Sequence, residues 1–241
     1  MNKATMERRD FLRYAATAAV GAALVGQSCV GQARQNDPRL RKALQFRMLP
    51  KNLSDAAKFK LAKKCGFEGV EGTPMEDLAA ARELGRLARE AGTPIHSIVY
   101  GGWNAPFSDP DPKVIDKGLA GMETALRSAK ALGADTVLLV PAVLNEDVGY
   151  GQAYKRSQEH IRKLLPLAEQ LRVVIAVENV WNKFLLSPLE FARYVDEFES
   201  PWLRAYFDVG NVIIYGYAQD WIRTLGKRIV KIHLKDFKRK G

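Results

Sequence analysis

The sequence predicts an α/β fold, an incomplete (β/α)8 barrel in which about seven strands are present and the eighth is missing. Short apolar runs alternate with longer segments of helical character, an order typical of a parallel sheet covered by helices. Most runs contain four to six residues, as strands buried on both faces do. Three of the runs end in a side chain that can bind a metal ion. No glycine-rich phosphate-binding motif follows the first strand, which argues against a dinucleotide-binding fold.

The strands and helices are expected to alternate from Lys42 onward. The predicted strands cover residues 43–48, 67–71, 94–100, 136–140, 173–178, 203–208 and 229–233. The predicted helices cover residues 54–64, 75–90, 114–132 and 152–171 and two segments that begin near Ser187 and Gln219. Ser54 is a good N-cap for the first helix, and Gly66 and Gly92 end the first two helices. Pro166 is expected to kink or restart the helix in which it lies.

A closed barrel of this type needs one strand more than the sequence supplies. The sequence ends at Gly241, eight residues after His233. Either the sequence is a truncated form of a longer chain, which we favour, or the sheet stays open between its first and seventh strands. An unpaired strand edge promotes association, so a homo-oligomer is a further expectation.

The first 33 residues are expected to be a twin-arginine export signal, followed by a barrel domain over residues 34–241. The arginine pair lies in Arg8-Arg9-Asp10-Phe11-Leu12-Arg13, and an apolar run from Tyr14 to Val25 follows it. This run is too short and too weakly hydrophobic to span a membrane. We therefore expect a periplasmic or extracellular protein without stable membrane insertion after signal removal. There are two alternatives to a twin-arginine signal in this segment: an ordinary amphipathic helix, or a lipoprotein signal at Cys29.

Charge and cysteine content limit the remaining function classes. The net charge of +10 would suggest a nucleic-acid partner if it were clustered. Residues 1–40 carry +3 and the last eleven residues +4, which leaves only +3 for the rest, so no nucleic-acid partner is expected. Cys65 is the single cysteine after the predicted signal, so no intramolecular disulfide is expected in the domain. We expect Cys65 to lie on a helix and to be buried as a small hydrophobic side chain.

Glu178, Asp208 and His233 end the fifth, sixth and seventh predicted strands. The carboxyl ends of barrel strands converge on one rim, where barrel enzymes hold their catalytic residues. Two carboxylates and one imidazole suit a divalent ion such as Mn²⁺ or Zn²⁺. A buried carboxylate such as Glu178 requires a partner. Asp208 could instead cap a turn, and His233 taken alone could be a core histidine.

The residues around these positions resemble the sugar phosphate isomerase/epimerase family, which belongs to the xylose isomerase-like TIM barrel superfamily. The resemblance is greatest to the L-xylulose-5-phosphate 3-epimerase (hexulose-phosphate isomerase) group and covers roughly residue 43 to the C-terminus. The motifs that carry it are Glu178-Asn179-Val180-Trp181-Asn182, Phe207-Asp208-Val209-Gly210-Asn211 and Ile232-His233-Leu234-Lys235-Asp236.

The resemblance implies that Glu178, Asp208 and His233 bind one divalent metal ion, Mn²⁺ or Zn²⁺, with Mg²⁺ or Co²⁺ as alternatives. It also implies that Glu178 is catalytic. In such enzymes a second glutamate on the eighth strand faces the other side of the substrate carbon, and the reaction passes through an enediolate. This glutamate has no counterpart in the sequence, so we expect no turnover by the chain as printed.

The resemblance also implies a small-molecule sugar substrate. Asn211 and Arg239 match positions at which relatives contact substrate, and Glu71 and His96 are expected to face the same rim. Two other activities remain open: an exported metal-dependent lyase or hydrolase that acts on oxidised sugars, and a carbohydrate-binding remnant without catalysis. An endonuclease of the same fold is disfavoured because it needs more histidines than the three present.

Overall fold

The computed structural model describes residues 41–235. The fold described below belongs to residues 42–235. The predicted export signal, including Cys29, lies outside the described residues, and so does Arg239. Within residues 41–235 no helix has the length and apolar character that a membrane crossing requires.

A parallel sheet of seven strands forms the centre of this part of the chain, as predicted. Its strands are β1 (Ala43–Gln45), β2 (Gly69–Gly72), β3 (Ile95–Gly101), β4 (Thr136–Leu139), β5 (Val174–Glu178), β6 (Leu203–Asp208) and β7 (Ile229–His233). Each strand pairs with the next strand in the sequence. Across residues 41–235 no strand pairs with the outer edges of β1 and β7, so the sheet is an incomplete barrel.

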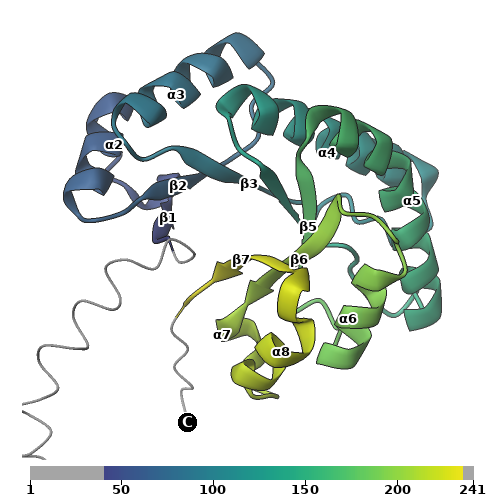
Figure 1. Ribbon diagram of the computed structural model, residues 1–241. Coiled ribbons are helices and arrows are strands. Elements are labelled where there is room, and N and C mark those ends of the chain that lie inside the picture. The colour runs from purple at the N-terminus through teal and green to yellow at the C-terminus, as the bar shows by residue number, and fades with distance from the viewer. Residues whose placement is uncertain (1–40, 236–241) are drawn as a thin grey trace, which may run out of the picture. The chain divides into compact units, whose positions relative to one another are not determined.

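Helices cover the outer face of this sheet (Figure 1). They are α2 (Asp55–Lys64), α3 (Leu78–Glu90), α4 (Pro112–Leu132), α5 (Tyr150–Leu171), α6 (Pro188–Asp196), α7 (Val209–Val212) and α8 (Ala218–Leu225), with the 3-10 helices η1 (Phe46–Met48) and η2 (Gly226–Arg228). Ser54 caps α2 through its side chain, as predicted. Ser187, near which a helix was predicted to begin, caps α6 in the same way. The short helix α7, directly after β6, was not predicted.

Some predicted boundaries were wrong. The first strand ends at Gln45 rather than at residue 48, because Phe46 leaves the sheet and its ring packs 4.9 Å from that of Phe59. The helix predicted from residue 75 begins at Leu78, because the Asp77 side chain accepts hydrogen bonds from Ala79 N and Ala80 N.

The prediction that the helix restarts at Pro166 and the prediction that Cys65 is buried also need correction. Helix α5 continues through Pro166 and does not restart there. Ile161 and Ala168, on either side of the proline, are both buried in the core, and this packing keeps the two halves in one helix. Cys65 is the C-cap of α2, and because the helix ends at this exposed position, the thiol is exposed rather than buried.

The two faces of the strands have different surroundings. Val177, Ala205 and Phe207 point outward and join the main core with residues from the helices. Tyr206 and Ala176 alternate with them and point into the barrel, where they form a small apolar cluster with Leu138. Glu178 and Asp208 lie two residues beyond Ala176 and Tyr206, so the same alternation directs both carboxylates to the interior.

Helices α3 and α4 approach each other closely at Gly85. A Cβ atom at this buried position would lie 2.3 Å from the backbone oxygen of Leu132, the last residue of α4. No side chain fits in this space without moving the helices apart.

We therefore expect Gly85→Ala to lower the free energy of unfolding by about 2 kcal/mol, because overpacking of a tight contact is destabilising. The matched control is Gly151→Ala in α5, where a Cβ atom would meet nothing within 4 Å; it should be neutral or stabilising by up to about 1 kcal/mol. Urea unfolding followed by circular dichroism measures both. Equal stability of the two variants would contradict the close approach of α3 and α4.

Candidate active site

The ends of β5, β6 and β7 bring Glu178, Asp208 and His233 together. One potential ligand atom from each residue lies within 4.8 Å of the other two. His233 Nδ1 is 2.7 Å from Glu178 Oε1 and 4.0 Å from Asp208 Oδ2. Both carboxylates are buried, whereas the imidazole is partly exposed. The sequence prediction that these three side chains converge at one rim agrees with this geometry.

The three donor atoms fit a divalent cation. Ligands held about 2.1 Å from one ion lie roughly 3 to 4.2 Å apart, depending on their angle. The separations of 2.7 and 4.0 Å around His233 Nδ1 differ only slightly from this range. Small side-chain rotations are therefore sufficient for Glu178, Asp208 and His233 to share an ion. Oxygen and imidazole donors together suit Mn²⁺, Zn²⁺ and Co²⁺.

His233 lies between two carboxylates. Its Nδ1 atom faces Glu178 Oε1, and its Nε2 atom is 3.0 Å from Glu71 Oε2. Burial alone would lower the pKa of His233, but the hydrogen bonds to Glu178 and Glu71 and the charges of both outweigh burial and raise the pKa from 6.5 to about 10. In the metal-free chain the imidazole is therefore protonated and balances part of the negative charge of the site.

The pKa values of Glu178 and Glu71, which share His233 as a partner, are shifted in opposite directions. Burial raises the pKa of Glu178, and the charge of Asp208 contributes to the increase, although the hydrogen bond with His233 opposes it. Burial would also raise the pKa of Glu71, but hydrogen bonds from His233, Tyr206 and Ser97 lower it instead. Glu178 is thus the more basic carboxylate, as a group that accepts a proton must be.

Asp208 is fixed by its neighbours on two sides. Asn179, the residue after β5, forms a reciprocal pair with it: Asn179 Nδ2 donates to Asp208 O at 2.9 Å, and Asp208 N donates to Asn179 Oδ1 at 2.8 Å. The Asp208 side chain also accepts a hydrogen bond from Asn211 N at 2.9 Å and so caps α7. The role of Asp208 as a cap, considered as an alternative from the sequence, is compatible with metal binding because Oδ2 remains directed toward His233.

Lys235 contributes a second positive charge to the site. Its Nζ atom lies 3.0 Å from Asp208 Oδ2 and 2.6 Å from Asn211 Oδ1. The ammonium group also lies 5.4 Å from the ring centroid of Trp181. Gly210 makes room for this side chain, since a Cβ atom there would lie 2.4 Å from Lys235 Cγ. In the metal-free chain Asp208 therefore pairs with a cationic side chain, that of Lys235, which is itself partly exposed to solvent.

The four residues predicted to bind substrate occupy different positions. Glu71 is 4% exposed and contacts His233. Asn211 lies next to Asp208 and is buried, and its amide donates to Asn179 O at 2.8 Å. His96 is the second residue of β3 and lies toward the amino end of that strand, where burial and the charge of Lys231 lower its pKa to about 4. Arg239 lies outside the described residues.

Sequence reasoning missed Tyr206, Ser97 and Lys235. The Tyr206 hydroxyl donates to Glu71 Oε1 at 2.6 Å, and the Ser97 hydroxyl donates to the same atom at 2.9 Å. Tyr206 precedes Asp208 by two residues, and Lys235 follows His233 by two. The two-residue period of a strand could have indicated that Tyr206 faces the barrel interior together with Asp208. Lys235 lies beyond the end of β7 and is exposed, so the strand period does not apply to it. No comparable signal marked Ser97.

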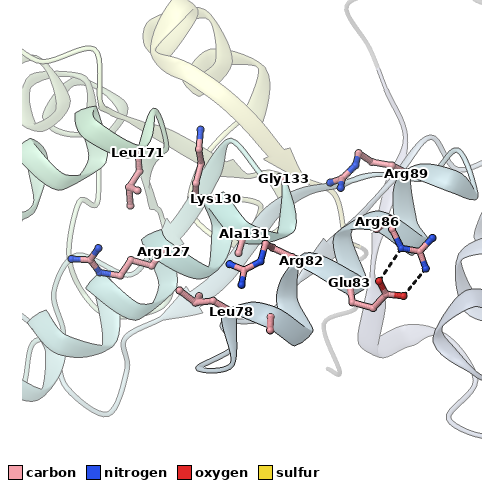
Figure 2. Close-up of a pocket in the computed structure, with 11 residues that line it drawn as sticks. Leu78, Arg82, Glu83, Arg86, Arg89, Arg127, Lys130, Ala131, Gly133 and Leu171 are labelled. Carbon is pink, nitrogen blue, oxygen red and sulfur yellow. Dashed lines mark hydrogen bonds and ion pairs between the residues drawn. The ribbon is translucent and has the colours of Figure 1, made fainter.

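A separate groove lies outside the barrel, over α3 and α4 (Figure 2). Its volume is about 730 Å³. The cationic residues that line it are Arg82, Arg86, Arg89, Arg127 and Lys130. Arg86 is paired with Glu83 at 2.6 Å, and the other lining residues leave an excess of positive charge. Because this groove is formed by outer helices rather than by strand ends, it is not part of the candidate active site.

Comparison with known proteins gives concordant matches. Residues 59–241 match the family described as "Xylose isomerase-like TIM barrel". A putative L-ribulose-5-phosphate 3-epimerase of Escherichia coli is 32% identical over 201 residues, which are 78% of this chain and 70% of that protein. A protein of the same description from Haemophilus influenzae is 29% identical over 200 residues, with the same two coverages.

A solved structure has a similar fold. The D-psicose 3-epimerase of Clostridium cellulolyticum, solved with D-tagatose, superposes with a TM-score of 0.72 at 17% sequence identity. The match covers 80% of this chain and 72% of that one. At this low identity the likeness concerns the fold.

The raised pKa of His233 predicts a pH-dependent stability for the metal-free chain. The folded chain retains a proton that the unfolded chain releases near pH 6.5, so the stabilisation is complete below pH 6.5 and is lost as the pH rises to about 10. Between pH 6 and pH 9.5 the free energy of unfolding of the EDTA-treated wild type should fall by about 2 kcal/mol more than that of His233→Gln. Parallel urea titrations measure this difference; identical pH dependence would show that His233 carries no retained proton.

The contact between Lys235 and Asp208 predicts competition with a metal ion. We expect Lys235→Met to increase the affinity for Mn²⁺ about fivefold, because a repulsive charge and a competing partner of Asp208 are both removed. Lys231→Met is the matched control, since Lys231 lies on β7, close to Lys235 in the sequence, but pairs with Asp135 at 3.0 Å. Isothermal titration with Mn²⁺ measures both variants. An equal increase in the control would indicate a general charge effect rather than competition at Asp208.

Proposed function

The chain belongs to the xylose isomerase-like TIM barrel family, and we propose that it is a sugar epimerase or isomerase that depends on a divalent metal ion. The proposed substrate is a ketose or a ketose phosphate. The proposed reaction begins with removal of a proton from the carbon next to the carbonyl group. The observation that carries this proposal is the convergence of Glu178, Asp208 and His233 at the ends of three neighbouring strands, with ligand atoms within 4.8 Å of one another.

Glu178, Asp208 and His233 would hold the metal ion. When bound, a divalent ion supplies a Lewis acid that polarises a carbonyl oxygen and stabilises negative charge. The donor set supports this assignment because the two carboxylates offer oxygen atoms and His233 offers a ring nitrogen. The cluster of buried negative charges supports it as well, since a cation would offset the cost of burying them together.

Glu178 is the proposed base. The residue is 8% exposed and lies at the carboxyl end of β5, at the rim where barrel enzymes bind substrate. Burial and the nearby charge of Asp208 raise the pKa of Glu178, so the carboxylate is a better proton acceptor than an exposed one. Removal of the proton next to a carbonyl leaves an enediolate, and return of a proton to the same carbon completes the exchange.

The named relatives support the substrate class. The two proteins from Escherichia coli and Haemophilus influenzae are described as putative epimerases of L-ribulose 5-phosphate, a ketose phosphate. Lys235 supplies a partly exposed ammonium group at the same rim, and ammonium groups bind phosphate as point charges. We therefore include phosphorylated ketoses among the proposed substrates.

The test is solvent isotope exchange with the Mn²⁺-loaded chain in D₂O. Proton NMR would follow the loss of the C–H signal next to the carbonyl in a panel of ketoses and ketose phosphates. Inversion needs a second proton donor on the opposite face of the carbon, whereas exchange needs Glu178 alone. We expect exchange with at least one panel member and a loss of about a thousandfold in Glu178→Gln, since a positioned base contributes roughly 10²- to 10⁴-fold.

Glu169→Gln in α5 is the matched control, because Glu169 is exposed and lies on an outer helix. It should exchange at the wild-type rate. Metal content is measured for each variant, so that loss of the base is separated from loss of the ion. Exchange that persists in Glu178→Gln would remove Glu178 from the mechanism, and absence of exchange by a metal-loaded wild type would overturn the proposed function.

A further inference from the structure

Glu71 is a buried carboxylate that lies behind His233. Its two oxygens have separate partners. Oε1 accepts hydrogen bonds from Tyr206 at 2.6 Å and from Ser97 at 2.9 Å. Oε2 faces His233 Nε2 at 3.0 Å. The side chain of Glu71 is 3% exposed, so both oxygens are occupied inside the protein.

The two hydroxyl groups fix the orientation of this carboxylate. Ser97 is the register partner of Glu71 in the β2–β3 pair, and Tyr206 lies in the interior on β6. The hydroxyl oxygens of Ser97 and Tyr206 are themselves 3.3 Å apart. The Tyr206 ring also packs against the His233 ring, with centroids 4.5 Å apart. All of these groups lie on strands, so Glu71 Oε2 is held in a rigid position toward the imidazole.

This position determines which ring nitrogen is free to bind a cation. An ionised carboxylate only accepts hydrogen bonds, so Nε2 must carry the proton that it donates to Glu71. The other nitrogen, Nδ1, faces Glu178 and Asp208 at 2.7 and 4.0 Å. In a metal-bound site Nδ1 is the atom that offers its lone pair.

We propose that Glu71 is a positioning residue that acts through His233: it holds the Nε2–H group and thereby presents Nδ1 to the metal ion. This inference rests on the proposed function, because it assumes a divalent ion at Glu178, Asp208 and His233. It replaces the role of substrate contact that the sequence suggested for Glu71, since a substrate at the rim does not reach a carboxylate enclosed by Ser97, Tyr206 and His233. A carboxylate behind a metal-bound histidine typically fixes both its tautomer and its orientation.

The first experiment is Glu71→Gln, which preserves the size of the side chain. Tyr206 and Ser97 both donate toward the position of Oε1, so the oxygen of the new amide will occupy that place and its NH₂ group will face His233. Nε2 then becomes an acceptor, and the proton moves to Nδ1, where it competes with the metal ion. We expect the affinity for Mn²⁺, measured by isothermal titration, to fall 10- to 100-fold.

A rescue variant separates this role from a purely structural one. Adding Tyr206→Phe to Glu71→Gln removes one donor, so that the amide can rotate and present its oxygen to Nε2. Part of the lost Mn²⁺ affinity should return, whereas a structural defect would become worse with the second change. Glu76→Gln, on the exposed segment before α3, is the matched control and should bind Mn²⁺ as the wild type does.

The second experiment reads the tautomer directly. In the wild type loaded with Zn²⁺, ¹⁵N chemical shifts of His233 should show a protonated Nε2 and a metal-bound Nδ1. Zn²⁺ on Nε2, or wild-type Mn²⁺ affinity in Glu71→Gln, would overturn the role of Glu71 and leave the metal-dependent function intact. Failure of the wild type to bind either ion would instead overturn the proposed function. If Glu71→Gln does not fold, the ¹⁵N measurement on the wild type decides alone.

Discussion

The structure of the site depends on one electrostatic constraint, the burial of three carboxylates around a single imidazole. Glu71, Glu178 and Asp208 all lie close to His233, and each carboxylate would be costly to bury without a partner. In the metal-free chain the protonated imidazole and Lys235 provide the compensating charge. A divalent ion would replace part of this compensation, so metal affinity and the stability of the metal-free fold depend on the same groups.

Side chains alternate between the two faces of the sheet, so the site and the main core lie on opposite faces. Outward residues such as Val177 and Phe207 pack against helices and supply the main core. Inward residues such as Tyr206 and Glu178 form the polar network and the small interior cluster. Apart from α7, whose residue Asn211 bonds to Asp208, the helices therefore stabilise the sheet without contributing to the site. A change at the contact of α3 with α4 should affect stability more than metal binding.

The arrangement also assigns different tasks to two glutamates. Both bond to His233, but Glu71 is enclosed by hydroxyl groups from β3 and β6, whereas Glu178 lies at the strand end beside Asp208. Burial would raise the pKa of Glu71, but hydrogen bonds from His233, Tyr206 and Ser97 lower it and make Glu71 a fixed acceptor. Burial next to another carboxylate raises the pKa of Glu178 and favours proton transfer. The surroundings, rather than the residue type, distinguish a positioning group from a base.

The sequence by itself determined the order of strands and helices and the three residues that end β5, β6 and β7. A strand buried on both faces is a run of apolar residues, so a polar residue at its end is easily recognised. It did not determine that Glu71 lies behind His233, that Lys235 pairs with Asp208, or that α5 continues through Pro166. These features depend on contacts between segments far apart in the chain, such as Glu71 and His233, which are 162 residues apart. Only the tertiary structure decides them, because the curvature of the sheet brings β2 and β7 across the interior of the barrel from one another.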